Sequence, residues 1–273
     1  MFSIVSGRQR GREEDARAVT DAEVPAELAR LWRLSSGSRL GRPAALDVDR
    51  VVQTAVQLAD RAGLAGVTLP KIAAELDVTS MSLYRYVGSK DELFVLMQDA
   101  ATGPPPQLDV PAEDWRAGLR AWAVAQRLAL HERPWVARLP VTGPPAGPNQ
   151  IGWMDVALRV LRGTGLDWGA KLGVLTLVSG YVRQASLLAD ELAAGRRGSG
   201  MDQAAVERAY GRALAQLVDP QRFPEVAAVF ASAPFQTPPP EGYDDPATNP
   251  DFTFGLDRIL DGVAAAIEQT PPT

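Results

Sequence analysis

The sequence TLPKIAAELDVTSMSLYRYVGSK, residues 68–90, decides how the first part of the chain folds. Thr68 can cap a helix whose apolar positions recur at helical spacing, namely Leu69, Ile72, Ala73 and Leu76. Asp77 and Val78 interrupt that pattern, and Thr79 or Ser80 can cap a second helix that ends near position 86. We expect Val78, Leu83 and Met81 to turn inward. Two short helices joined by a tight turn predict a helix-turn-helix, although an ordinary helical hairpin would have the same spacing.

The order of residue types in this stretch carries a resemblance to a known family. Residues 68–78 read T-x-x-x-I-A-x-E-L-x-V, followed by SLYRYV at 82–87 and SKDEL at 89–93. This block, from about position 46 to 101, closely resembles the tetracycline-repressor (TetR) family of transcriptional regulators. The phrase FGLDRILDG at 254–262 is similar to the carboxy-terminal helix of the branch nearest the tetracycline repressor itself.

Length and composition set the limits of this interpretation. The 273 residues suit a small DNA-binding head and a larger body with its own core. Apolar residues make up 46% and charged residues 22%, which is typical of a soluble globular protein, and we expect a cytoplasmic protein without a membrane span. The absence of Cys excludes disulfides and zinc-thiolate sites. The net charge of -5 argues mildly against a protein that coats DNA without regard to sequence, and it is compatible with a sequence-specific DNA-binding protein.

Three regions follow from the pattern. Residues 1–43 form an N-terminal extension that we expect to be largely flexible, apart from a short amphipathic helix over 26–34. Residues 44–101 form the helix-turn-helix head, whose first helix (47–62) braces the other two. Its fourth helix begins after Ser89 and runs to about position 101, where the run GPPP at 103–106 marks the boundary of a helical body, 102–273. The predicted fold class is therefore all-α.

The head is acidic overall, with seven basic against eight acidic residues over 39–101, a balance of -1. DNA binding must therefore depend on where the positive charges lie and not on their number. Arg39 and Arg42 stand in an arm that could enter a minor groove, although Leu40 occupies the place of a Gly in the stricter motif. The resemblance implies that the recognition helix reads bases near its start and that its tyrosines and the following lysine meet phosphates. Pro70 departs from the family pattern, which leaves open which bases the second helix reads. The DNA-binding candidates are Arg39, Arg42, Thr68, Lys71, Thr79, Ser80, Ser82, Tyr84, Arg85, Tyr86 and Lys90.

The body shows only helical patterns, separated by loops rich in Pro and Gly. We expect helices at 112–132, 149–163, 168–194, 201–217, 224–231 and 251–268. The helix at 168–194 is apolar around much of its circumference, which indicates burial on more than one side. The resemblance implies that this helix and the last one form a four-helix interface in a homodimer, whereas the simpler alternative places both in the core.

An unusual density of tryptophan in the first body helices indicates an effector pocket. Trp122 and Gln126 lie four residues apart on one helix face, at positions where the resemblance places drug contacts. The candidate ligand-binding residues are Trp122, Gln126, Trp135, Trp153, Met154 and Gln184, and each tryptophan could equally fill the core. The single His, His131, does not fall at the position of the family's metal-binding histidine, so we expect neither metal nor cofactor, and tetracycline is disfavoured.

The leading hypothesis is a homodimeric repressor that binds a palindromic operator in double-stranded DNA and is released by a small organic effector. An all-helical enzyme is disfavoured because the sequence has no Cys, one His and no Gly-framed Ser elbow. A helical small-molecule binding protein whose head has lost its DNA affinity is a third hypothesis.

Overall fold

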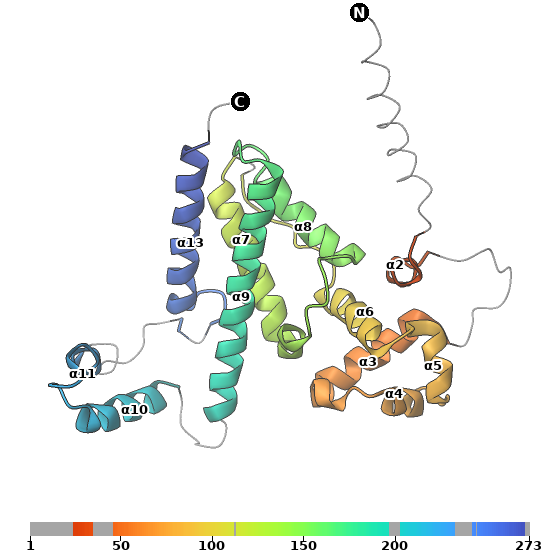
Figure 1. Cartoon of the computed structure of the whole chain (residues 1–273), viewed down its shortest axis with the longest axis horizontal. Coiled ribbons are helices and arrows are strands. Elements are labelled where there is room, and N and C mark those ends of the chain that lie inside the picture. Colours follow the sequence, from red (N-terminus) through yellow and green to blue (C-terminus); the bar gives the residue numbers. More distant parts are fainter. Residues whose placement is uncertain are drawn as a thin grey trace, which may run out of the picture.

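The computed structural model describes residues 24–34, 46–111, 113–196, 203–232, 242–243 and 245–270. Within these ranges every regular element is a helix and no strand occurs, as the sequence pattern predicts. The helices form a small head, labelled α3 to α6 in Figure 1, and a body of longer helices. The all-α prediction is therefore confirmed.

The head is built from α3 (Val48–Ala62), the short turn η1 (Leu64–Gly66), α4 (Leu69–Glu75) and α5 (Ser80–Val87). Side chains cap each helix start, since Asp47, Thr68 and Thr79 each accept a bond from the backbone N–H three residues later. Asp77 adopts a left-handed conformation, φ 55°, in the turn between α4 and α5. The sharp change of direction at this turn completes the helix-turn-helix.

Helix α6 (Lys90–Thr102) connects the head to the body (Figure 1). The Ser89 hydroxyl caps its start by accepting from the Glu92 N–H at 3.0 Å. Gly103, with φ 67°, ends the helix in a conformation that favours glycine. The helix packs against α3 in the head and against α8 in the body.

A short N-terminal helix, α2 (Ala26–Leu31), joins the head core although it precedes the helix-turn-helix block. Leu31 is 4% exposed within that core. Arg30 makes two hydrogen bonds to Glu92 at the start of α6, and Trp32 Nε1 donates to the carbonyl of Ala146 at 2.8 Å. Helix α2 therefore contacts both the head and a loop of the body.

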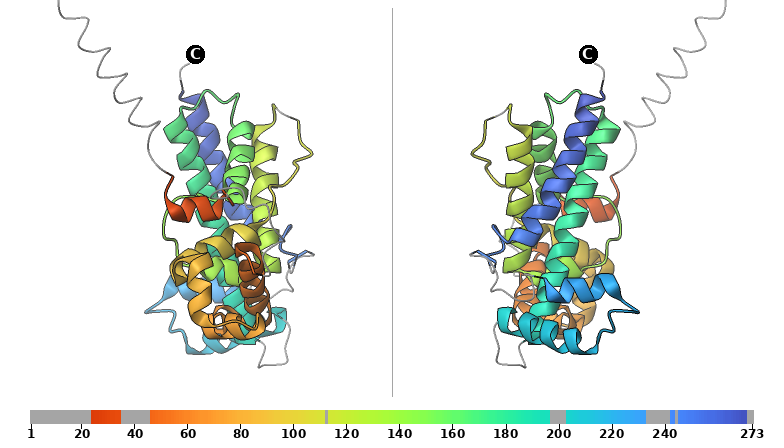
Figure 2. Two further views of the ribbon diagram at one scale, coloured as in Figure 1. Left: turned by 90° about the vertical axis from the view of Figure 1, so that its right-hand side faces the viewer. Right: turned by 90° about the vertical axis from the view of Figure 1, so that its left-hand side faces the viewer.

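The centre of the body consists of four helices that run alongside one another (Figures 1 and 2). These are α7 (Trp115–Glu132), α8 (Pro148–Val160), α9 (Trp168–Arg196) and α13 (Pro250–Glu268). A turn of 3₁₀ helix, η2 (Pro134–Arg138), follows α7 and packs on α6 and α9. The bounds of the four long helices agree with the predicted ranges to within about one turn, whereas the sequence pattern did not predict η2.

Helices α10 (Gln203–Leu217) and α11 (Pro224–Ala231) pack on each other, and α10 touches α9. They lie beside α9 on the side away from the head (Figure 1). Much of their surface is exposed in the single chain, where Leu217 is 78% and Tyr210 57% exposed. Both therefore present apolar side chains to solvent.

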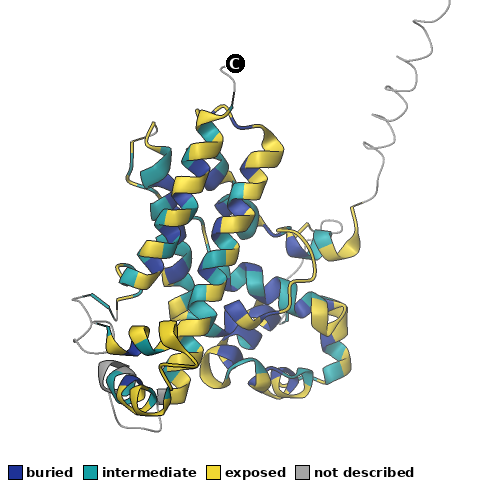
Figure 3. Cartoon of the chain, turned by 60° about the vertical axis from the view of Figure 1, so that its left-hand side comes forward, coloured by how far each residue is buried: buried dark blue, intermediate teal, exposed yellow. Residues whose placement is uncertain are grey.

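Two clusters of buried side chains form the cores. Figure 3 colours the buried positions dark blue along the ribbon. The first joins α2 to α6 in the head and extends into the body through Trp135, Val136 and Leu139. The second joins α7, α8, α9 and α13. Because η2 belongs to the head cluster, the head and body share buried apolar surface instead of meeting only at α6.

Candidate DNA-binding and effector sites

Helix α5 presents its outer face at the end of the head remote from α13 (Figure 1). Leu83 and Val87 are fully buried and fix the inner face of this helix in the head core. Tyr84 is 45% exposed on the opposite side, and Arg85 beside it is also exposed. A short helix with a buried inner face and a polar, exposed outer face has the geometry that enters a major groove.

Several predicted contacts already have partners within the protein. The Thr79 hydroxyl caps α5 by accepting from the Ser82 N–H at 3.3 Å, and the two hydroxyls lie 2.8 Å apart. Thr68 caps α4 in the same way, because its hydroxyl oxygen accepts from the backbone N–H of Lys71 at 3.4 Å. Tyr86 is partly buried against the head core. These side chains fix the two helices, whereas Tyr84, which is exposed and caps neither helix, is better placed to meet DNA.

The described basic residues of the prediction all lie on the surface. Lys71, Arg85 and Lys90 are exposed, and Lys90 Nζ lies 5.3 Å from the centre of the Phe94 ring. Arg39 and Arg42, the predicted minor-groove arm, lie outside the described residues. Three cations near the outer side of the head are consistent with contacts to phosphate oxygens.

The prediction that Met81 turns inward is wrong. Met81 is 75% exposed in the first turn of α5, where Leu83 occupies the buried position instead. It shares the outer face with Tyr84 and Arg85, three and four residues further on. Apolar side chains on a recognition helix can contact the methyl group of thymine, so Met81 joins the candidate readers. The sequence feature that could have indicated the exposure of Met81 is its position between Ser80 and Ser82, which mark the start of the helix.

Within the body, Trp122 and Trp153 form the centre of the predicted effector site. Trp122 on α7 is 3% exposed, and its Nε1 donates to the Trp153 carbonyl on α8 at 3.0 Å. Gln126 lies one turn after Trp122, and its buried Nε2 has no hydrogen-bond partner among the described residues. Met154 packs against the same cluster. The structure therefore brings four of the six predicted ligand residues onto the adjacent helices α7 and α8.

The other two predicted residues lie elsewhere. Trp135 belongs to the head cluster, because η2 directs its indole towards α3, where Nε1 donates to Asp60 Oδ1 at 2.7 Å. Gln184 is exposed on α9, since its helix face turns away from the body core. The prediction that Trp135 and Gln184 line one cavity with Trp122 is therefore wrong for both residues. The shallow pocket near Trp135, about 220 Å³, is lined by Asp60, Glu132, Arg133, Pro134 and Trp135.

Asp99 on α6 connects the DNA-binding head to the body helix α8. Its carboxylate accepts from the Gln150 N–H at 3.0 Å and from Asn149 Nδ2 at 3.3 Å. A side chain on one helix thus caps the start of another, where Gly147 leaves room for the carboxylate. Burial raises the pKa of Asp99 above its ordinary value, while the hydrogen bonds from residues 149 and 150 oppose that shift.

The carbonyl groups at the end of α6 are also held by body side chains. Trp153 Nε1 donates to the Gly103 carbonyl at 3.1 Å, and Arg133 donates to that of Ala101 at 3.3 Å. Because the Trp153 carbonyl in turn accepts from Trp122, a continuous series of hydrogen bonds joins α7, α8 and the end of α6. A displacement of either indole would therefore disturb the hydrogen bonds at the end of α6, the helix that connects the head to the body.

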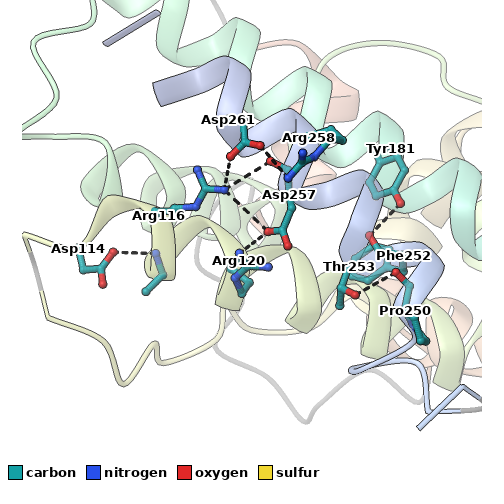
Figure 4. Close-up of polar contacts among 11 residues, drawn as sticks. Asp114, Arg116, Arg120, Tyr181, Pro250, Phe252, Thr253, Asp257, Arg258 and Asp261 are labelled. Atoms are coloured by element: carbon teal, nitrogen blue, oxygen red, sulfur yellow. Dashed lines mark hydrogen bonds and ion pairs between the residues drawn. The ribbon is translucent and has the colours of Figure 1, made fainter. Parts of the chain in front are cut away.

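A shallow apolar groove of about 550 Å³ runs between α9 and α13. Its lining includes small residues that allow close approach of another helix, and the full set is Gly173, Val174, Leu177, Arg258, Ile259, Gly262, Val263 and Ala266. Ion pairs on the other side of α13 tie it to α7: Arg116 pairs with Asp257 and Asp261, and Arg120 with Asp257 (Figure 4). The hydrogen bond from Arg116 holds the pKa of Asp261 below its ordinary value.

Helix α9 has an unusual exposed apolar surface. Over residues Trp168–Gly195 its length and hydropathy would suit a membrane span, yet only 17% of the most apolar window is buried in the single chain. Leu172, Leu177, Leu188 and Leu192 are each about half exposed. Within the described ranges, no other helix is long and apolar enough to suit a membrane span. An exposed apolar surface of this extent is typical of an interaction site.

A helix-turn-helix head on an all-helical body with one uncovered apolar face defines a class of proteins, the DNA-binding regulators that assemble through their body helices. Two family models match the chain: "Bacterial regulatory proteins, tetR family" over residues 51–97 and "Tetracyclin repressor-like, C-terminal domain" over residues 106–267. The chain belongs to the tetracycline-repressor family of transcriptional regulators. It is therefore a DNA-binding regulator, and the alternative hypothesis of an enzyme is not supported.

Individual relatives agree with this assignment. The chain is 31% identical over 264 residues to the HTH-type transcriptional repressor DrrR1 of Streptomyces coeruleorubidus, covering 95% of this chain and 92% of the relative. It is 30% identical over 146 residues to the class E tetracycline repressor of Escherichia coli, covering 53% of this chain and 69% of that protein. The crystal structure of ActR from Streptomyces coelicolor in complex with actinorhodin has the same fold, with TM-score 0.67 and 24% identity, covering 84% of this chain and all of ActR.

Proposed function

We propose that this regulator is a cytoplasmic homodimer that represses transcription by binding a palindromic operator, and that a small organic effector releases it. The observation that carries the proposal is the outer face of α5, where Met81, Tyr84 and Arg85 are exposed on a helix that is rigidly packed on its other side. Two such helices would enter successive major grooves about 34–36 Å apart, or at a multiple of that spacing.

The exposed apolar surface of α9 and the groove beside α13 support the dimer. Pairing both helices with their copies would bury Leu172 and Leu177, which water otherwise surrounds. Each 100 Å² of apolar surface removed from water stabilises an assembly by about 2.5 kcal/mol before the costs of association. The same contact would set the distance between the two heads.

The division into regions is part of this proposal. We assign residues 44–101 to the DNA-binding domain, 102–273 to the effector-binding and dimerisation domain, and 1–43 to an N-terminal extension. The two family matches, which end at residue 97 and begin at residue 106, are consistent with a boundary near residue 102. The burial of Trp135 in the head core indicates that the two domains work as one packed unit.

We place the effector beside Trp122, Gln126, Trp153 and Met154. The chain of hydrogen bonds from Trp122 through Trp153 to the Gly103 carbonyl offers a route to the head. An effector that moves either indole would shift the end of α6 and with it the spacing of the heads. Release requires only that the effector binds the mis-spaced state more tightly than the DNA-binding state. In ActR the bound molecule is actinorhodin, which shows that a relative of this fold accepts an organic ligand.

The proposal is tested by selecting bound duplexes from a random DNA pool at moderate salt. Wild type is compared with Tyr84→Ala and with Tyr210→Ala, an exposed tyrosine of α10 that serves as the matched control. We expect one palindrome to be enriched by wild type and by the control but not by Tyr84→Ala. If no sequence is enriched even at low salt, where phosphate contacts are strongest, the repressor proposal fails.

A further inference from the structure

Arg127 is a buried cation of the body that forms no ion pair within the described residues. Its side chain on α7 is 7% exposed, and its guanidinium carbon lies 4.0 Å from the centre of the Phe252 ring on α13. No carboxylate of the described part of the chain forms an ion pair with it, in contrast to Arg116 and Arg120 on the same helix. Burial lowers the pKa of Arg127, which means that its charged form is poorly solvated where it lies.

Two further polar groups, one on α7 and one on α9, are buried without a hydrogen-bond partner among the described residues. Gln126 Nε2 and Ser186 Oγ are the buried side-chain nitrogen and oxygen atoms that find no hydrogen-bond partner among the described residues. Buried polar groups are nearly always paired, so an unpaired set points to a missing partner. All three groups can donate a hydrogen bond, and the amide nitrogen and the guanidinium can only donate.

The helical spacing places the three groups on the inner faces of two packed helices. Gln126 and Arg127 follow the buried Trp122 and Ala123 by one turn on α7, and Ser186 follows the buried Val182 by one turn on α9. Helices α7 and α9 are in direct contact. The same face of α7 carries the proposed effector contact Trp122, so the two donors of α7 adjoin that site.

The Phe252 ring fixes the geometry of the cation. Tyr181 of α9 stacks on this ring, with centroids 5.5 Å apart and planes 12° apart, and its hydroxyl donates to the Phe252 carbonyl at 2.9 Å (Figure 4). Arg127 therefore meets an aromatic ring that is itself held in place by α9. The carboxylate that faces this region from α13 is Asp251, and it accepts from the Tyr243 hydroxyl at 3.0 Å.

We propose that Arg127, Gln126 and Ser186 form a subsite for an anionic oxygen group, such as a carboxylate, on the effector. Three donors on two packed helices, one of them positively charged, are complementary to a group that only accepts hydrogen bonds and carries negative charge. The indole of Trp122 would cover the apolar part of the same molecule. This inference rests on the proposed effector-responsive function and specifies the chemistry of the ligand: a flat organic acid.

The test compares two small probes of nearly equal shape, sodium benzoate and neutral benzamide, on the full-length protein. Thermal unfolding is measured at constant ionic strength as each probe is titrated. At a concentration tenfold above its Kd, benzoate should raise the Tm of wild type by about 3–6 °C, and benzamide by clearly less. Arg127→Met should abolish this difference, because it keeps the apolar volume but removes the charge and the donors.

Arg162→Met is the matched control, since Arg162 is an exposed arginine of the same body. It should retain the preference for benzoate. Without probe, Arg127→Met should melt no lower than wild type, because it removes an unpaired buried charge. If Arg127→Met does not fold, Arg127→Gln provides the same comparison, as it also removes the charge.

Three results would overturn the subsite: equal responses of wild type to benzoate and benzamide, an unchanged benzoate preference in the Arg127 variant, or its loss in Arg162→Met as well. Operator binding by wild type and Arg162→Met is measured in parallel. Intact operator binding without a benzoate preference would refute the subsite alone. A benzoate preference that depends on Arg127, in a protein that selects no operator, would refute the repressor proposal and leave the subsite standing.

Discussion

Replacing Asp99 with Ala tests the joint between the head and the body. The carboxylate caps α8 by accepting from the Gln150 N–H at 3.0 Å and from Asn149 Nδ2 at 3.3 Å. Removal of a capping side chain costs about 0.5–2 kcal/mol, and leaving its buried partners unpaired costs about 1–3 kcal/mol. Release of a poorly solvated carboxylate offsets part of this. We therefore expect the free energy of unfolding to fall by about 1.5–3 kcal/mol, equivalent to a Tm lower by roughly 3–12 °C.

The assay is chemical and thermal unfolding of the full chain at fixed protein concentration. Asp109→Ala, which removes an exposed carboxylate shortly after α6, is the control and should change the stability by no more than about 0.5 kcal/mol. A value for Asp99→Ala within that same range would refute the capping role. It would also remove the argument that α6 and α8 move together.

The pH dependence of stability provides a second test of the same residue. Burial raises the pKa of Asp99 in the folded state, so the folded protein retains this proton at pH values where the unfolded chain has lost it. The contribution of Asp99 to stability is therefore fully present below its unfolded pKa and is lost as the pH rises through its folded pKa. Asp99→Asn should remove this component, so its stability should decrease less than that of wild type between about pH 4 and neutrality. Identical pH profiles would contradict the direction of the shift.

Three other substitutions test contacts around the head. Trp153→Phe removes the hydrogen bond to the Gly103 carbonyl and should cost about 0.5–1.5 kcal/mol of stability. It should change effector-induced DNA release more than it changes DNA affinity itself. Equal changes in both would contradict the transmission of effector binding through this hydrogen bond. Gly88→Ala should destabilise by about 1–2 kcal/mol in thermal unfolding, because φ is 62° and a Cβ would overlap Glu92; a neutral result would mean that the turn can relax. Glu92→Gln should weaken its pairing with Arg30 and speed limited proteolysis near α2, and an unchanged cleavage rate would show that apolar contacts alone hold that helix.

The local signals in the sequence predicted the helices well. Capping residues such as Thr68, Thr79 and Ser89 act within one turn of backbone, so a short stretch contains all the atoms that form the cap. Gly63 and Gly103 end α3 and α6 because both adopt a positive φ, which glycine permits at little cost. The spacing of apolar residues then fixes which face of most helices is buried.

Placement across helices was harder to predict. Trp135 sits in a short 3₁₀ turn, whose direction depends on Asp60 in a helix more than 70 residues earlier in the chain. Gln184 lies on a helix that is apolar on several sides, so periodicity could not indicate which side meets the chain's own core. Met81 is apolar yet exposed, because hydrophobicity alone does not separate a core residue from one that is kept for a partner. Arg127 was missed because its significance lies in its burial without an ion pair among the described residues, and a sequence does not show that.

The indole of Trp135 has a practical consequence. It bridges the two parts of the molecule, with its Nε1 bonded to Asp60 of α3 while its backbone belongs to η2. Its fluorescence therefore depends on the arrangement of the two parts, and separation of α3 from η2 would expose it to water and shift its emission to longer wavelength. The difference in emission between wild type and Trp135→Phe isolates this side chain while Trp122 and Trp153 stay in place, so it reports the position of the head relative to η2. Movement of the head could then be followed in real time, without an attached label and without DNA.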